Sequence, residues 1–169
     1  MASRISGEIF SLLDDKMPHF GLGFLPASIQ FSTAADAGKR IGATPDGRCA
    51  GAPLCESLGA ISGKDVKGTT ALLSSVTSLA LDKALGIPVV NLTVNPAFDN
   101  GILRSLIESY MDMGGLHLQL TCTSREMLEE AMADPDRHRN LVIRVGGYSE
   151  YFHRLSDDLK KLVLSRTIH

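Results

Sequence analysis

Hydrophobic and polar residues follow the periods of regular secondary structure only after Gly68. Apolar runs and one strict alternation predict buried strands at 89–94, 116–122 and 141–145. Apolar positions three and four residues apart predict helices at 69–85, before Gly114-Gly115, before Asp134, and from about Ser156 to Arg166. After the first helix, strands and helices alternate, which predicts an α/β fold with mostly parallel strand pairing.

Residues that favour helix ends support these boundaries. Gly86 is expected to end the first helix, because glycine adopts a left-handed cap without steric cost. The three later helices each begin near a side chain that can accept a backbone N–H bond: Asp99 or Asn100, then Thr123 in a Thr-x-x-Glu capping box with Glu126, then Ser156.

The strand at 116–122 carries different side chains on its two faces. Leu116, Leu118 and Leu120 share one face, and His117, Gln119 and Thr121 share the other. The three leucines already account for a contact with the core. His117 and Gln119 therefore lie either on a solvated sheet face or in a cavity, as inward positions do in barrels, and the pattern leaves both possibilities open.

The N-terminal part of the chain has little regular pattern. Residues 1–20 hold a short amphipathic stretch that Pro18 breaks, and we interpret them as a lead-in. Residues 21–68 are rich in glycine and proline, which predicts a long loop region that lies over other structure. We therefore divide the chain into a lead-in at 1–20 and one domain at 21–169.

Composition narrows the class of protein. The 169 residues are enough for one domain with a core, and the formal net charge of -2 gives no support for nucleic-acid binding. No apolar run is long enough to span a membrane, so no membrane partner is expected. The N-terminus lacks a basic-then-apolar export signal, and the cytoplasm is the expected location.

Cysteine and histidine give no metal or disulfide pattern. The three cysteines are an odd number without a Cys-x-x-Cys motif, and the five histidines form no His-Glu-x-x-His motif, so no bound metal is expected. Cys122 ends a buried strand and is expected to be inert core, whereas Cys49 and Cys55 lie in the glycine-rich region.

The stretch "IRVGGYSEYF", residues 143–152, places two glycines directly after an apolar strand. A turn that needs positive φ is one explanation for Gly146 and Gly147. The block "RVGGYSEYF", however, closely resembles the C-terminal signature of the glycyl radical enzymes, such as pyruvate formate-lyase. Further family-like segments occur in order: "ATPDGRCAGAPL" at 43–54, then "GGLHLQL", then "EEAMADPDRHRNLVIRV", and finally "SRTIH".

The resemblance covers roughly residues 20–169 and implies the C-terminal part of an α/β barrel of glycyl-radical-enzyme type, with the radical glycine on a loop after a buried strand. It places the radical on Gly147 and makes 21–169 a glycine-radical domain. Residues expected to support the loop are Arg144, Val145, Gly146, Tyr148, Ser149 and Phe152.

In this family a radical S-adenosylmethionine activase, which carries an iron–sulfur cluster, removes one hydrogen from the glycine Cα. The chain itself then needs no bound cofactor. A planar radical carbon shares its electron with both flanking amides, and a Cβ would clash in that planar form. Because oxygen destroys exposed carbon radicals and cuts the backbone there, Tyr148, Tyr151 and Phe152 are expected to protect the loop tip.

Two departures from the family pattern change the expected function. Gly146 stands where alanine or serine is common, and the upstream Cys-x-Glu motif that bears the thiyl radical is absent; Cys55-Glu56 is the nearest string. The chain should therefore store a radical for lyase, dehydratase, decarboxylase or acyltransferase chemistry whose catalytic region a partner or parent chain supplies. The alternatives are a spare part that repairs an oxygen-damaged enzyme, and a non-catalytic assembly module that keeps the fold.

Overall fold

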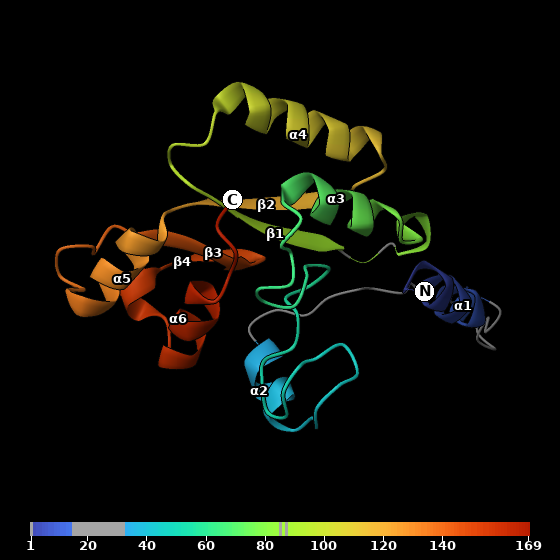
Figure 1. Ribbon diagram of the computed structural model, residues 1–169, viewed down its shortest axis with the longest axis horizontal. Coiled ribbons are helices and arrows are strands. Elements are labelled where there is room, and N and C mark those ends of the chain that lie inside the picture. The colour runs from blue at the N-terminus through green and yellow to red at the C-terminus, as the bar shows by residue number, and fades with distance from the viewer. Residues whose placement is uncertain (1, 15–32, 85, 87) are drawn as a thin grey trace, which may run out of the picture.

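A computed structural model describes residues 2–14, 33–84, 86 and 88–169 (Figure 1). Its elements are, in chain order, α1 (Ala2–Asp14), α2 (Ala34–Lys39), α3 (Thr69–Thr77), η1 (Leu81–Lys83), β1 (Val89–Val94), α4 (Asn100–Asp112), β2 (His117–Cys122), α5 (Arg125–Ala133), β3 (Val142–Gly146), β4 (Tyr148–Tyr151), η2 (Phe152–Arg154) and α6 (Asp157–Leu164). The mixed α/β content expected from the sequence is confirmed. Between α2 and α3 the chain is turn and coil, as the glycine-rich pattern predicted for 21–68, but α2 lies inside that range and was not expected.

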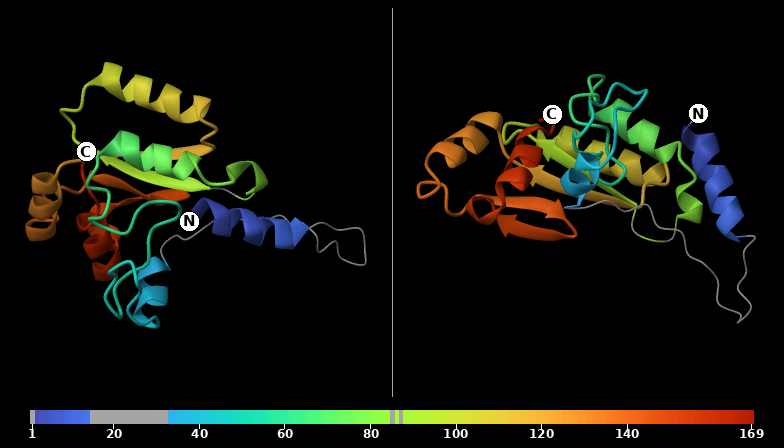
Figure 2. Two further views of the ribbon diagram at one scale, coloured as in Figure 1. Left: turned by 45° about the vertical axis from the view of Figure 1, so that its right-hand side comes forward. Right: turned by 90° about the horizontal axis from the view of Figure 1, so that it is seen from below.

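Strands β1 and β2 form a parallel pair in which Val89 lies opposite His117 and Val94 opposite Cys122. Helices α3 and α4 lie on one face of this pair (Figures 1 and 2). Their apolar side chains pack on that face around a buried cluster: Leu73, Val76, Leu81, Val90 and Tyr110. Burial of this apolar surface is the main force that holds the helices on the sheet.

Strands β3 and β4 form a separate antiparallel hairpin, with Val142 opposite Tyr151 and Arg144 opposite Ser149. The expected parallel pairing is therefore wrong for the third strand, and the sequence pattern missed β4. The physical reason is local. Gly147, at φ +57°, reverses the chain immediately after β3, so that the next four residues pair back onto it.

The hairpin has its own apolar core, formed with α5, η2 and α6. Buried side chains from all four elements meet there: Leu128, Ala131, Ile143, Val145, Phe152, Leu155 and Val163. Among the described residues the four strands form two two-stranded sheets. That they are the C-terminal part of a larger α/β barrel stays a prediction.

Two of the expected helix caps are confirmed and one is wrong. Asp99 accepts the N–H of Ile102 at 2.8 Å, and Ser156 accepts that of Leu159 at 3.4 Å. The third helix is capped by Ser124 instead of Thr123. Thr123 is fully buried and its N–H donates to the carbonyl of Val94, so it extends the β1–β2 pair by one residue and is not free to cap.

The first predicted helix is also shorter than its apolar pattern suggested. α3 ends at Thr77 instead of continuing toward Gly86. The hydroxyl groups of Thr77 and Ser78 donate to the carbonyls of Ser74 and Ser75, at 3.2 and 2.7 Å. Such local bonds compete with the helical pattern and explain the early end.

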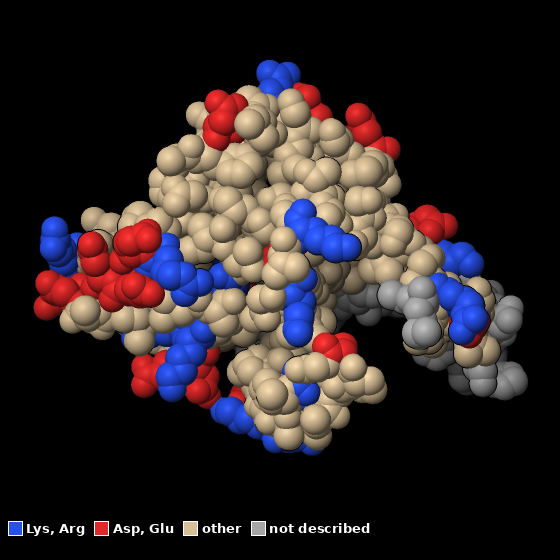
Figure 3. All heavy atoms as spheres, in the orientation of Figure 1, with Lys and Arg blue, Asp and Glu red and all other residues tan. Residues whose placement is uncertain are grey.

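The N-terminal stretch at 9–13 belongs to α1, and Pro18 and the proposed boundary at residues 20–21 lie outside the described residues. None of the described helices is both long and apolar enough to cross a membrane. On the face shown in Figure 3, acidic and basic side chains are interspersed, and acidic ones gather over α5. That face therefore offers no basic stripe for a nucleic-acid backbone.

The packing around Gly115 leaves no room for a side chain, and this can be tested. A Cβ built at this position overlaps the ring of Tyr110, which lies in the core beneath it. We expect Gly115→Ala to lower the free energy of unfolding by about 1–3 kcal/mol through overpacking. Urea denaturation measures this change. Gly42→Ala is the matched control, since a Cβ there has no atom within 4 Å, and an equal loss in both variants would contradict the packing argument.

Candidate functional site

The candidate site is the tight reversal between β3 and β4, where Gly147 stands alone as a bend between Gly146 and Tyr148. The register between the strands shifts between Arg144 and Gly146, so one extra residue is accommodated just before the bend. At φ +57°, Gly147 occupies the left-handed region that glycine adopts most easily. The turn explanation and the radical explanation therefore both fit the backbone at this position.

The bend is open to solvent within the described chain. Gly146 is buried, but Gly147 and Ser149 are exposed, and Tyr148 is 45% exposed. Tyr151 is also exposed, so of the three expected protective aromatic residues only Phe152 is buried. The expectation of a protected tip is wrong for this chain by itself. The reason is that the apolar side chains of the hairpin pack beneath it, away from the bend.

The base of the hairpin is rigidly packed. Ile143, Val145 and Phe152 are at most 1% exposed and contact α5 and α6 through the second core cluster. The guanidinium of Arg144 donates across the hairpin to the hydroxyl of Ser149 at 3.2 Å. Of the six residues expected to support the loop, Val145, Gly146 and Phe152 are buried, Arg144 contacts Ser149, and Tyr148 is exposed; their supporting role stays a prediction.

Arg166, which follows α6, ties β3 to a distant loop. Its guanidinium forms two bonds of 2.7 Å with the carboxylate of Glu56, and it also donates to the carbonyls of Arg144 at 2.9 Å and Val145 at 3.3 Å. The side chains of Arg166 and Glu56 are only 7% and 13% exposed. A two-bonded arginine–carboxylate pair is directional as well as strong, and this one fixes the strand that leads to Gly147.

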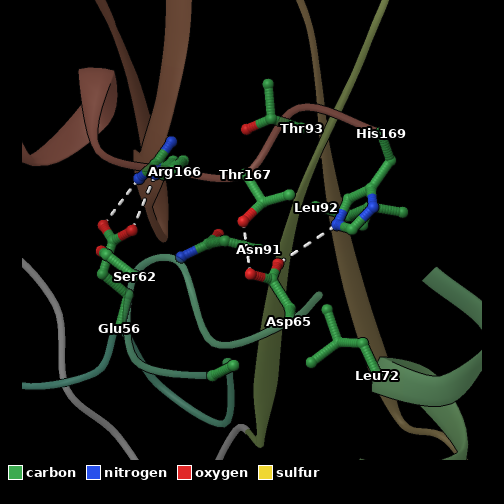
Figure 4. A pocket seen from close by; sticks show the side chains of 12 residues that line it. Glu56, Ser62, Asp65, Leu72, Asn91, Leu92, Thr93, Arg166, Thr167 and His169 are labelled. Carbon is green, nitrogen blue, oxygen red and sulfur yellow. Dashed lines mark hydrogen bonds and ion pairs between the residues drawn. The ribbon is translucent and has the colours of Figure 1, made fainter. Parts of the chain in front are cut away.

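The segment after Arg166 is anchored beside β1. The N–H of His169 donates to the carbonyl of Thr93 at 3.0 Å, and Nε2 of His169 lies 3.2 Å from Oδ2 of Asp65. Thr167 donates its hydroxyl proton to the other carboxylate oxygen of Asp65. Figure 4 shows this group and the Glu56–Arg166 pair on opposite sides of a small cavity of about 40 Å³.

The structure places His117 and Gln119 on the sheet face away from α3 and α4. Gln119 is 5% exposed, its Nε2 lies 3.2 Å from Nε2 of His117, and its Oε1 has no hydrogen-bond partner among the residues that the structure describes. Leu116 and Leu120, on the other face, are 52% and 36% exposed. The polar face is therefore the more buried one. A solvated face does not describe Gln119, and the cavity-facing role of the pair stays a prediction.

The cysteines differ in exposure and surroundings. Cys122 is exposed, so the expectation that it is core is wrong, because it lies at the open end of β2. Burial raises the pKa of the Cys55 thiol, and the nearby carboxylates of Asp46 and Glu56 raise that pKa further. Among the described residues no group of three or more His, Cys, Asp or Glu side chains could hold a metal ion.

Sequence reasoning missed the residues that fix the hairpin from outside. Glu56 and Arg166 are separated by 110 residues, and no local pattern connects them. Thr121, whose hydroxyl accepts the N–H of Arg144 at 3.3 Å, read only as a polar position of an alternating strand.

Comparisons with known proteins agree with the signature around the bend. The family model described as glycine radical matches residues 55–153. The chain is 36% identical over 163 residues to a probable dehydratase, YbiW, of Escherichia coli strain K12, covering 90% of this chain and 20% of that protein. It is 35% identical over 154 residues to an indoleacetate decarboxylase of Tractidigestivibacter scatoligenes, covering 87% of this chain and 17% of that protein.

A solved structure shares the fold. The B12-independent glycerol dehydratase of Clostridium butyricum, in its glycerol-bound form, matches with a TM-score of 0.89 and 30% identity, over 99% of this chain and 22% of that chain. The chain thus spans about a fifth of the length of the proteins it matches.

The three thiols should differ in reactivity. Cys49 and Cys122 are exposed, whereas Cys55 is partly buried and its pKa is raised. Because the thiolate is the reactive form, we expect iodoacetamide at neutral pH to label Cys49 and Cys122 before Cys55. Mass spectrometry of the digested chain gives the order, and labelling in urea should make the three rates similar. Fastest labelling at Cys55 in the folded chain would contradict this environment.

Proposed function

The chain belongs to the glycine radical family, and from that premise we propose that it carries a stable glycyl radical on the Cα of Gly147. A radical S-adenosylmethionine activase would install the radical by removing one hydrogen atom from that carbon. The radical would then initiate thiyl chemistry of the lyase, dehydratase, decarboxylase or acyltransferase type. The observation that carries the proposal is the position of Gly147: a glycine at positive φ, at an accessible tip, inside the segment that the family model matches.

Accessibility supports the installation step. An activase must reach the Cα hydrogen, and the exposed bend at Gly147 presents that carbon at the end of a well-packed hairpin. The neighbouring exposed side chains of Tyr148 and Ser149 would form part of the surface that the activase contacts. The packed base lets the tip be presented without unfolding the rest of the domain, which we take to be residues 21–169.

The same exposure supports a second partner. A carbon radical in contact with dissolved oxygen is short-lived, so storage requires a cover that the described part of the chain does not supply at Gly147. We infer that a parent or partner region provides this cover, together with the thiyl cysteine and the rest of a barrel. Leu120 in β2 and Leu116 just before it are exposed and offer an apolar surface for that contact.

Two other functions compete with this one. A spare-part domain would carry the same radical but restore a relative whose own glycine had been cut by oxygen. An assembly module would keep the fold without forming a radical. The first is distinguished by its ability to revive a cleaved enzyme, and the second by the lack of any radical after treatment with a competent activase.

Electron paramagnetic resonance tests the radical directly. After anaerobic treatment with a matched activase, reductant and S-adenosylmethionine, we expect a doublet, because one hydrogen remains on the radical carbon. The doublet should disappear in Gly147→Ala. Gly146→Ala is the matched control and should keep the doublet, since relatives commonly carry alanine there. A doublet that survives in Gly147→Ala would place the radical elsewhere.

Oxygen provides an independent test of the position. Admitting air to the activated chain should cut the backbone at Gly147 and produce a fragment that runs from near Tyr148 to His169. Mass spectrometry of samples activated and then aerated should show this fragment, and samples aerated without activation should not. An intact chain after loss of the radical signal would contradict the assignment.

A further inference from the structure

We propose that Arg166, oriented by Glu56, and Thr121 are positioning residues that seat the Gly147 hairpin against the β1–β2 pair. This inference rests on the proposed function for its consequence in radical chemistry, but its structural part stands on the contacts alone. It concerns residues outside the signature around the bend, 19 or more positions away from Gly147 in the sequence.

The need for such residues arises from the way the strands meet. β3 lies beside β2, yet the two belong to separate sheets. The hairpin is therefore not joined to the β1–β2 pair by a backbone ladder. Instead, the N–H of Arg144 donates to the hydroxyl of Thr121, and the carbonyls of Arg144 and Val145 accept from Arg166. Side chains thus make the polar bonds that a neighbouring strand would otherwise make.

Arginine is specifically suited to this position. The planar fork of Arg166 bonds both carboxylate oxygens of Glu56 with one edge and reaches two successive carbonyls of β3 with its remaining N–H groups. A lysine ammonium has three donors at a single point and cannot serve both partners in this geometry. Glu56 holds the fork in place and balances its buried charge.

The contacts end two residues before the proposed radical carbon. Val145 accepts from Arg166, Gly146 is buried, and Gly147 follows at the tip. A shift of β3 would therefore move Gly147 directly, and a misplacement of about 1 Å can cost about a hundredfold in the rate of a positioned reaction.

Hydrogen exchange of the full chain tests the structural part. We expect Arg166→Lys to speed exchange of the amides at 144–151 at least tenfold, with those of α4 changed less than twofold. Thr121→Val, which removes one hydroxyl at nearly constant volume, should speed the amide of Arg144 in the same direction. Arg104→Lys is the matched control, because Arg104 pairs with Glu108 on the surface of α4. Equal acceleration throughout the chain, or none at the hairpin, would overturn the proposal.

Electron paramagnetic resonance of the same variants tests the positioning role. With a matched activase, Arg166→Lys should give a broader doublet and a radical that decays several times faster than in the unaltered chain, because Gly147 samples more conformations. Arg104→Lys should leave both unchanged. An identical line shape and lifetime in Arg166→Lys would overturn the positioning role. A lack of signal in the unaltered chain would instead count against the proposed function, and the exchange data would still decide whether Arg166 seats the hairpin.

Discussion

The buried guanidinium of Arg166 is the interaction on which the geometry of the site depends. It joins a loop at Glu56, the strand β3 and the segment after α6, three parts of the chain that share no secondary structure. Without it, the two apolar clusters would still pack, but their relative placement would depend on side-chain contacts at the junction of the sheets. Together with the bond from Arg144 to Thr121 and the bonds of His169 to Thr93 and Asp65, it fixes the hairpin that carries Gly147 relative to the β1–β2 pair.

The hairpin is buried below the bend and exposed to solvent at the bend itself. Val145 and Phe152 are sealed in the core, while Gly147 and Tyr148 face solvent. A radical on Gly147, as proposed above, would need a cover at this exposed position. The asymmetry fits a chain that spans about a fifth of the length of the relatives it matches, and it agrees with the covering partner or parent region proposed above.

The sequence predicted the parts of the fold that rest on local physics. The strands β1, β2 and β3 and the caps at Asp99 and Ser156 follow from periodicity and from side chains that accept backbone N–H bonds. β4 was missed because the sequence Tyr-Ser-Glu-Tyr has no buried alternation and pairs only because the chain reverses at Gly147. The Glu56–Arg166 pair was missed because a contact across 110 residues leaves no trace in either neighbourhood.

Arg166 follows Gly147 in the sequence, whereas both segments that it contacts, at Glu56 and in β3, precede Gly147. The contact therefore connects the parts of the chain on either side of the bend. Phe152 and Val163 likewise follow Gly147 and are buried against Ile143 and Val145, which precede it. If the backbone were cut at the bend, the two pieces would therefore stay associated through these contacts, as a protein does after a protease has cut one loop. The C-terminal piece would stay bound in its original position, so any replacement strand would first have to displace it.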